Sequence, residues 1–189
     1  MIYFTADLHL GHNAIIQMQD RPFSDLAEMN QALIANINHM VHKDDSLYIL
    51  GDIAHHISFE ERNELVRQIK CRNKYLLLGN HDFFGGKTNY DENLFVWVKD
   101  YSRESFSGMN IVMMHYPLMS WDRMRRGSIM LHGHIHSSGE YNRRNIMDGI
   151  RRFDVGVDAN GYCPVPITKV LEWATEAGAN DPGRDYHER

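Results

Sequence analysis

The chain has 189 residues, of which 43% are hydrophobic and 24% charged, and these proportions fit one soluble globular domain. Its formal net charge of −5 excludes tight binding to nucleic acid or to an anionic membrane through bulk charge. No apolar stretch is long enough to span a bilayer, and residues 1–7 lack the basic segment of a signal peptide. Because Cys71 and Cys163 lie far apart in sequence, we expect reduced thiols and a cytoplasmic location.

The first half of the chain alternates short apolar runs with helical periodicity. Three runs read as buried strands, at residues 2–6, 46–50 and 75–78. Each run is followed directly by polar residues, which places side chains of possible function at the ends of the strands. The order strand, helix, strand, helix, strand is typical of a βαβαβ unit with a site at the carboxyl ends of its strands.

Helices are expected between these strands. A short helical stretch is expected to end near Gln19, before Pro22 interrupts the chain. Between Ser24 and Val41, apolar residues recur at three- and four-residue steps, which predicts an amphipathic helix with Ser24 as its N-cap. The spacing of serine and glutamate in residues 58–61 is that of a capping box, and it predicts a second helix towards residue 70.

The second half of the chain is rich in short apolar runs separated by turn residues. These runs predict β-strands with few helices between them, at residues 94–98, 103–106, 110–114, 128–132 and 151–157. Residues 167–176 predict one closing helix, and residues 178–189 form a polar tail that we expect to be poorly ordered. We therefore expect a single domain over residues 1–177.

Five short segments concentrate side chains that bind metal ions, and each follows an apolar run. They are Asp7-Leu8-His9, Gly51-Asp52, Gly79-Asn80-His81-Asp82, His115 and Gly133-His134-Ile135-His136. On an extended chain, residues two positions apart point to the same side, so the D-x-H and H-x-H segments can each reach one site with both side chains. Glycines before three of the segments allow sharp turns and close approach. Imidazole and carboxylate together suit Zn, Mn, Fe and Ni.

The ordered series D-x-H, GD, GNHD, H and G-H-x-H resembles the motifs of the calcineurin-like metallophosphoesterase superfamily. The resemblance covers the chain from Asp7 to His136. It implies a four-layer α/β/β/α sandwich of two packed mixed sheets. It also implies two divalent metal ions, for which we expect Mn²⁺ before Fe, Zn or Ni.

The resemblance implies a division of the ligands between the two metal ions. The first ion would be held by Asp7, His9, Asp52 and His136. The second ion would be held by Asp52, which bridges the pair, together with Asn80, His115 and His134.

His81 would then be the catalytic histidine that stays outside the ligand set. Two metal ions clamp a phosphate and activate water to attack phosphorus, while His81 stabilises the transition state or protonates the leaving oxygen. Asp82 follows at once in the sequence, and two roles are open to it, orientation of His81 and capping of a helix.

The substrate class is suggested by residues that are missing. The segment after Asp52 lacks the Asp and Arg of the protein phosphatase branch (GDxxDRG), and Leu78 stands where that branch has arginine. Those arginines grip a phosphomonoester dianion, so their absence favours small phosphodiesters or nucleotides as substrates.

The start of the chain also resembles short phage and bacterial phosphoesterases. Alternatives are a phosphomonoesterase and a nuclease of short oligonucleotides, with a non-catalytic metal-binding scaffold as the least expected. We expect no stable binding to nucleic acid.

Several further residues near the motifs have two readings each. His12 could contact a phosphate, or it could lie in a surface turn. His55 and His56 could line the mouth of the site, but exposure to solvent without such a role is favoured. Arg21 is a candidate for binding negative groups of the substrate. Trp121 is a candidate for stacking on a base, although core packing is favoured.

Overall fold

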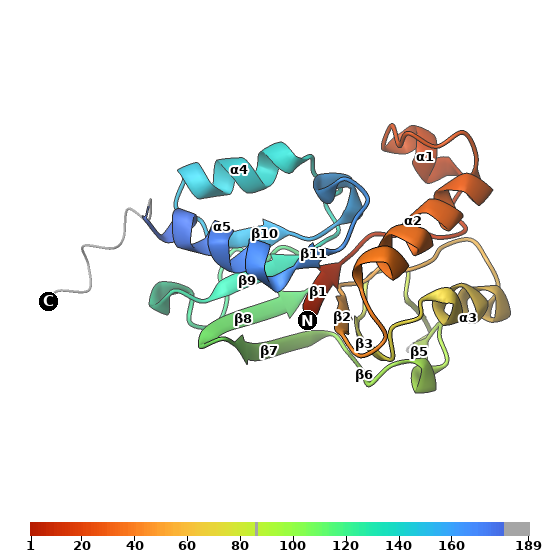
Figure 1. The fold of residues 1–189 in the computed structure, drawn as a ribbon, viewed down its shortest axis with the longest axis horizontal. Helices are drawn as coiled ribbons and strands as arrows, with labels where there is room; N and C mark the ends of the chain where they lie inside the picture. Colours follow the sequence, from red (N-terminus) through yellow and green to blue (C-terminus); the bar gives the residue numbers. More distant parts are fainter. Residues whose placement is uncertain (86, 180–189) are drawn as a thin grey trace, which may run out of the picture.

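A computed structural model describes residues 1–85 and 87–179 of the chain. Two β-sheets pack together and carry helices, which confirms the α/β sandwich expected from the sequence (Figure 1). In the described residues, no helix is long and apolar enough to cross a membrane.

The first sheet is built mainly from the βαβαβ unit. Its strand order is β11-β1-β2-β3-β6, in which β1, β2, β3 and β6 are parallel and β11 is antiparallel to β1. The strands are β1 (Ile2–Thr5), β2 (Ser46–Ile49), β3 (Asn73–Leu77), β6 (Trp97–Lys99) and β11 (Val165–Pro166). The parallel register brings the carboxyl ends of β1, β2 and β3 to one edge of the sheet.

The second sheet has the order β10-β9-β8-β7. Its strands are β7 (Tyr101–Phe106), β8 (Met109–Met114), β9 (Ile129–His132) and β10 (Arg152–Asp154). β7 pairs with β8 in an antiparallel hairpin, whereas β8, β9 and β10 are parallel. A separate hairpin joins β4 (Phe83–Phe84) to β5 (Lys87–Thr88).

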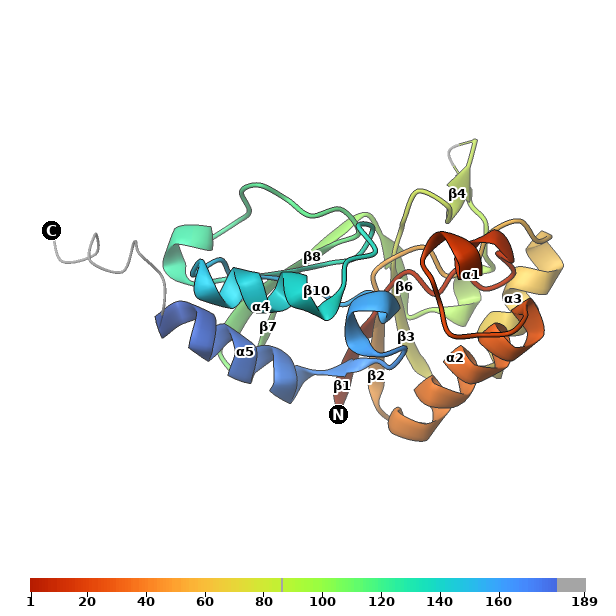
Figure 2. The same ribbon diagram turned by 90° about the horizontal axis from the view of Figure 1, so that it is seen from above.

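The helices divide between the two halves of the molecule. The first half carries α1 (Ala14–Met18), α2 (Leu26–Met40) and α3 (Phe59–Gln68), and the second half carries α4 (Gly139–Met147) and α5 (Ile167–Ala179). Short 3₁₀ turns lie at Glu92–Leu94, Met124–Arg126 and Val157–Asn160. Helices α4 and α5 run side by side in both views (Figures 1 and 2).

Two hydrophobic clusters hold the layers together. One cluster packs α2 and α3 onto one face of the first sheet, where Leu33 of α2 and Leu47 of β2 are fully buried. The other lies between the sheets and includes Phe4 of β1, Leu131 of β9 and Trp173 of α5. Both faces of the first sheet are therefore covered, as parallel strands require.

Three elements differ from the sequence prediction. The N-cap of α2 is Asp25, whose carboxylate accepts the N–H of Glu28, and not Ser24, whose hydroxyl bonds the Glu28 side chain. Helix α4 was not predicted, because residues 137–145 are mostly polar, include three charged side chains and contain no run of apolar residues. The strand expected at residues 94–98 is β6, which begins only at Trp97 after a 3₁₀ turn.

The capping box and the closing helix agree with expectation, apart from their limits. The Ser58 side chain accepts the N–H of Glu61, whose carboxylate accepts the N–H of Ser58, so α3 begins as the sequence predicts. Helix α5 extends to Ala179 and so includes the first two residues of the expected polar tail. The rest of that tail, residues 180–189, lies outside the described residues.

Replacement of Leu33 by alanine tests the core beneath the first sheet. We expect Leu33→Ala to lower the free energy of unfolding by about 2–5 kcal/mol, because it leaves a cavity at a fully buried position. Urea denaturation followed by circular dichroism measures the change. Gln31→Ala, at an exposed position of the same helix, is the control and should stay within about 0.5 kcal/mol of the wild type. Equal stability of the two variants would contradict this packing.

Candidate metal centre

The residues that the sequence singled out come together at the carboxyl ends of the strands. Asp7 and His9 follow β1, Asp52 follows β2, and Asn80 follows β3. The second sheet contributes three further residues to the same place, His115 after β8 and then His134 and His136 after β9. Both sheets therefore supply the site.

The backbone of these segments is left-handed and not extended. Positive φ angles occur at Asp7 (57°), His9 (51°), Asp52 (54°), His134 (72°) and His136 (45°). The expectation that D-x-H and H-x-H converge through strand alternation is therefore wrong, although the convergence itself occurs. Non-glycine residues in this conformation are uncommon and cluster at functional sites, where surrounding contacts hold them in place.

Two glycines allow the segments to approach one another closely. A Cβ atom on Gly51 would lie 2.5 Å from Nδ1 of His115 and 2.7 Å from the Cα atom of Gly79. A Cβ atom on Gly79 would likewise collide with the Asp52 carboxylate. The glycines that precede Asp52 and Asn80 are thus required by the close packing of the two loops.

Asp7, His9 and His136 form one group of possible metal ligands. One ligand atom from each residue lies within 4.8 Å of the others. Nδ1 of His136 lies 2.7 Å from Oδ2 of Asp158, and since a carboxylate accepts, the ring donates through Nδ1. That hydrogen bond orients the ring and leaves Nε2 of His136 as the nitrogen that could bind a cation.

Asp158 and Arg21 support this group, and the role of Asp158 was missed from the sequence. Arg21 donates from Nε and Nη2 to the two Asp158 oxygens at 2.8 and 2.9 Å. It also donates to the backbone carbonyls of Asp7 and Leu8. Arg21 is 4% exposed, so it holds the site together and is sequestered from a substrate. The two partners are 137 residues apart in sequence, so no local pattern could predict that they pair.

Asn80, His115 and His134 form a second group. Oδ1 of Asn80 lies 3.1 Å from Nε2 of His115 and 3.0 Å from Nδ1 of His134, and the two ring nitrogens are 3.2 Å apart. Nδ1 of His115 donates to the Leu50 carbonyl at 2.8 Å, which leaves its Nε2 as an acceptor. One possible ligand atom from each of the three residues thus faces the other two, at spacings that suit the shell of one cation.

Asp52 lies between the two groups. Its Oδ2 is 3.6 Å from Nε2 of His9 in the first group and 3.5 Å from Nε2 of His115 in the second. Its Oδ1 instead accepts the backbone N–H of His81 at 2.9 Å. One carboxylate oxygen is therefore directed towards both groups of ligands at once.

Burial sets the protonation of the site. It raises the pKa of the Asp7 carboxyl well above its usual range, helped by the negative charge of Asp154, and it also raises the pKa of Asp52. Burial lowers the pKa of His9 far below its usual value and that of His115 to about 4. The imidazoles of His9 and His115 are therefore neutral at pH 7, and the two carboxylates lack the compensating charge that a cation would supply.

A divalent metal ion fits this set of donors. Nε2 of His9 is buried and has no hydrogen-bond partner among the described residues. A buried polar atom without a partner is costly, and a ligated cation would satisfy it. Neutral imidazole, carboxylate and amide oxygen are also the donors that divalent transition metals accept.

Asp82 has neither of the two roles considered for it. Its carboxylate is fully buried and accepts the backbone N–H groups of Asp52, Ile53 and Gly79 as well as the hydroxyl of Tyr90. It therefore ties the loop after β2 to the loop after β3, and none of its bonds among the described residues reaches the His81 ring.

His81 lies at the open side of the site. Its side chain is 31% exposed, and its Nε2 is 3.9 Å from Oδ2 of Asp52. The ring of His55 lies against it, with centroids 3.8 Å apart. A partly exposed imidazole next to the ligand groups is placed to meet a bound molecule.

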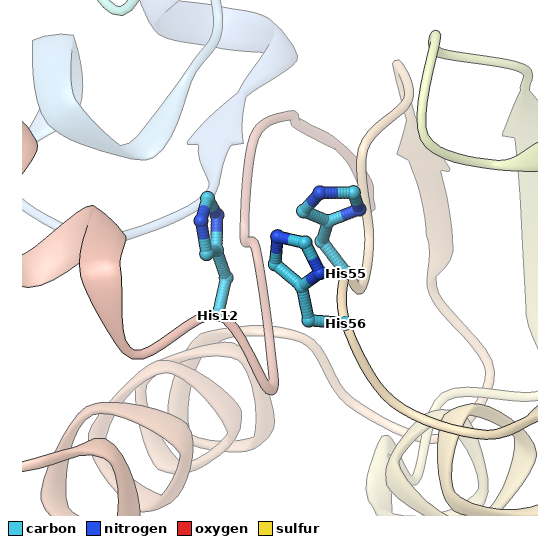
Figure 3. A group of neighbouring side chains, drawn as sticks. All are labelled: His12, His55 and His56. Carbon is cyan, nitrogen blue, oxygen red and sulfur yellow. The ribbon is translucent and has the colours of Figure 1, made fainter.

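Three more histidines gather beside the first group. His12 from the loop after β1 faces His55 and His56 from the loop after β2 (Figure 3), and ring nitrogens of the three lie within 4.8 Å of one another. His12 is nearly buried, and its Nδ1 lies 3.3 Å from Nδ1 of His9. This contact places His12 directly against His9, so His12 supports His9 and is not a surface histidine.

Trp121 does not reach the site. It is 7% exposed, packs with Val112 and Met130 on the second sheet, and donates from Nε1 to the carbonyl of Ser128. The structure thus supports a core-packing role for Trp121, and the burial of its ring excludes stacking on a base.

Comparison with known proteins gives relatives over most of the chain. An uncharacterised protein of Methanocaldococcus jannaschii is 28% identical over 171 residues, which cover 90% of this chain and 89% of the relative. The gene 66 protein of Mycobacterium phage L5 is 29% identical, with 84% of this chain and 87% of the relative covered. A solved protein of unknown function from Aquifex aeolicus has the same fold, with a TM-score of 0.70 at 24% identity over 91% of this chain and 98% of its own.

A family model extends the comparison to the motifs themselves. The model of the calcineurin-like phosphoesterases matches residues 1–159, which include every candidate ligand from Asp7 to His136. Members of this family hydrolyse phosphoesters with the help of divalent metal ions, and the two ligand groups described above suit such ions. The chain therefore belongs to the calcineurin-like phosphoesterase family.

Proposed function

We propose that this protein hydrolyses phosphodiesters with the help of two divalent metal ions, and we expect both ions to be Mn²⁺. One ion would be held by Asp7, His9 and His136 and the other by Asn80, His115 and His134, and Asp52 would be shared. The observation that carries the proposal is the position of Asp52, whose Oδ2 lies 3.6 Å from Nε2 of His9 and 3.5 Å from Nε2 of His115. A carboxylate oxygen that lies between the imidazoles of the two ligand groups suits a bridging ligand.

The chemistry is divided between the metal ions and the protein. When bound, the ions would supply positive charge to the phosphate oxygens and lower the pKa of a coordinated water. Asp52 divides its two oxygens, because Oδ1 accepts the N–H of His81 and leaves Oδ2 for the ions. The same hydrogen bond fixes the backbone of His81, whose partly exposed ring carries the proton for the leaving oxygen.

The substrate is a small phosphodiester, such as a nucleotide. The arginine that was a candidate for gripping a phosphate dianion, Arg21, is buried in its ion pair with Asp158. Leu78 precedes Gly79 in place of an arginine. A diester carries one negative charge fewer than a monoester dianion, so it needs less positive charge from side chains. The net charge of −5 argues against stable binding of long nucleic acid, and the two free cysteines suit the cytoplasm.

Hydrolysis of bis-p-nitrophenyl phosphate tests the proposed activity. We expect turnover with added Mn²⁺, loss of activity on chelation with EDTA, and slower hydrolysis of the monoester p-nitrophenyl phosphate. A preference for the monoester would support the phosphomonoesterase alternative. Hydrolysis of neither ester at full Mn²⁺ occupancy would support a metal-binding scaffold.

His81→Ala separates catalysis from metal binding. We expect the variant to keep its bound metal and to lose about 10²- to 10⁴-fold in kcat on bis-p-nitrophenyl phosphate, because it lacks the proton donor. Metal content is measured by inductively coupled plasma mass spectrometry. His39→Ala, at an exposed position on α2, is the control and should retain full activity. A wild-type rate in His81→Ala would refute the proposed acid role.

Asp158→Asn tests the support of the first ligand group. We expect metal affinity to fall about 10- to 100-fold, because the amide no longer holds Nδ1 of His136 as a donor. Titration with Mn²⁺ in an isothermal calorimeter measures the change, and a thermal melt confirms that the variant is folded. Asp148→Asn, at an exposed position after α4, is the matched control. Unchanged affinity in Asp158→Asn would show that His136 needs no such support.

A further inference from the structure

A cavity of about 400 Å³ opens directly beside the candidate metal centre. It shares Asn80 and His81 with that centre, so a molecule in the cavity can extend to a phosphate at the metals. The full lining consists of His55, Ile57, Phe59, Arg62, Asn80, His81, Phe83 and Asn89. This volume lies in the range of pockets that bind small organic ligands.

Two large aromatic side chains at the cavity are exposed to solvent and are not packed in the core. Phe59, the first residue of α3, is 50% exposed, and Phe83 on β4 is 47% exposed. The cap of α3 uses Ser58 and Glu61, so helix initiation does not depend on the Phe59 ring. Figure 2 shows the β4 hairpin standing out from the body of the molecule. Both rings are thus available to a ligand, and their contribution to the core is small.

Polar groups accompany the two rings. Arg62 donates from Nε to the Ile57 carbonyl and from Nη1 to the Ala54 carbonyl, while its Nη2 makes no hydrogen bond to any described residue. Asn89 donates to the carbonyl of His81 and keeps its side-chain oxygen as an acceptor. The cavity therefore combines apolar faces with one donor and one acceptor at its wall.

We propose that this cavity binds the nucleoside of a phosphodiester substrate, with the base packed on Phe59 and Phe83. The inference rests on the proposed function, because the shared residues Asn80 and His81 then place the phosphate of the same molecule at the metals. A base offers both a ring face and edge groups for hydrogen bonds, whereas an alkyl chain offers no partner to Nη2 of Arg62 or to the side-chain oxygen of Asn89. The cavity thus selects between diesters that the metal centre alone treats alike.

Paired substrates test this selection. Thymidine 5′-(p-nitrophenyl phosphate) and methyl p-nitrophenyl phosphate release the same leaving group and differ in the nucleoside. We expect the wild type to favour the thymidine ester about tenfold or more in kcat/KM, mainly through a lower KM. Phe83→Ala and Phe59→Ala should each reduce that ratio several-fold and leave the methyl ester unaffected. Tyr101→Ala, at an exposed aromatic residue of β7, is the control and should keep the ratio.

A binding measurement keeps this inference separate from the proposed activity. In saturation-transfer NMR, we expect the base protons of free thymidine to receive magnetisation from the wild type and from Tyr101→Ala, and much less from Phe83→Ala. Transfer without hydrolysis of any ester would support the cavity and refute the activity. Hydrolysis of both esters with equal kcat/KM, unchanged in the two phenylalanine variants, would overturn the nucleoside site and leave the activity standing. A preference for the methyl ester would assign the cavity to an alkyl group and also overturn it.

Discussion

The buried carboxylate of Asp82 is the contact on which the geometry of the site depends. A fully buried carboxylate is tolerated only when hydrogen bonds replace its lost water, and Asp82 obtains them from Asp52, Ile53, Gly79 and Tyr90. The three backbone donors belong to the loops after β2 and β3, and Tyr90 lies just after β5. The carboxylate therefore fixes the distance between those loops, which carry Asp52, the ligand proposed to be shared, and the catalytic candidate His81.

A second constraint joins the two sheets across the site. The backbone N–H of His134, after β9, donates to both oxygens of Asp7, after β1. Both residues have left-handed backbones, a conformation that costs free energy and persists only where surrounding contacts determine it. The sandwich supplies those contacts, so the ligand arrangement belongs to the packed pair of sheets and not to either sheet alone.

Proton placement on the imidazoles follows from partners that are remote in sequence. His115 donates to the carbonyl of Leu50, 65 residues away, and His136 donates to Asp158, 22 residues away. Each bond assigns the proton to Nδ1 and presents Nε2 to the centre. The cavity beside His81 extends the same centre outward, since it adds exposed aromatic rings to a site whose interior is otherwise polar.

The sequence alone determined the strands and helices of the first half, the identity of the candidate ligands and their convergence at strand ends. Apolar periodicity and residue chemistry are local properties, so they can be recognised from the sequence without knowledge of the fold. The tertiary structure alone decided the left-handed backbone at Asp7 and Asp52, the pairing of Arg21 with Asp158, the clamp made by Asp82 and the presence of α4. These features depend on contacts between residues that are distant in the chain, and no local pattern records which distant partner a side chain will meet.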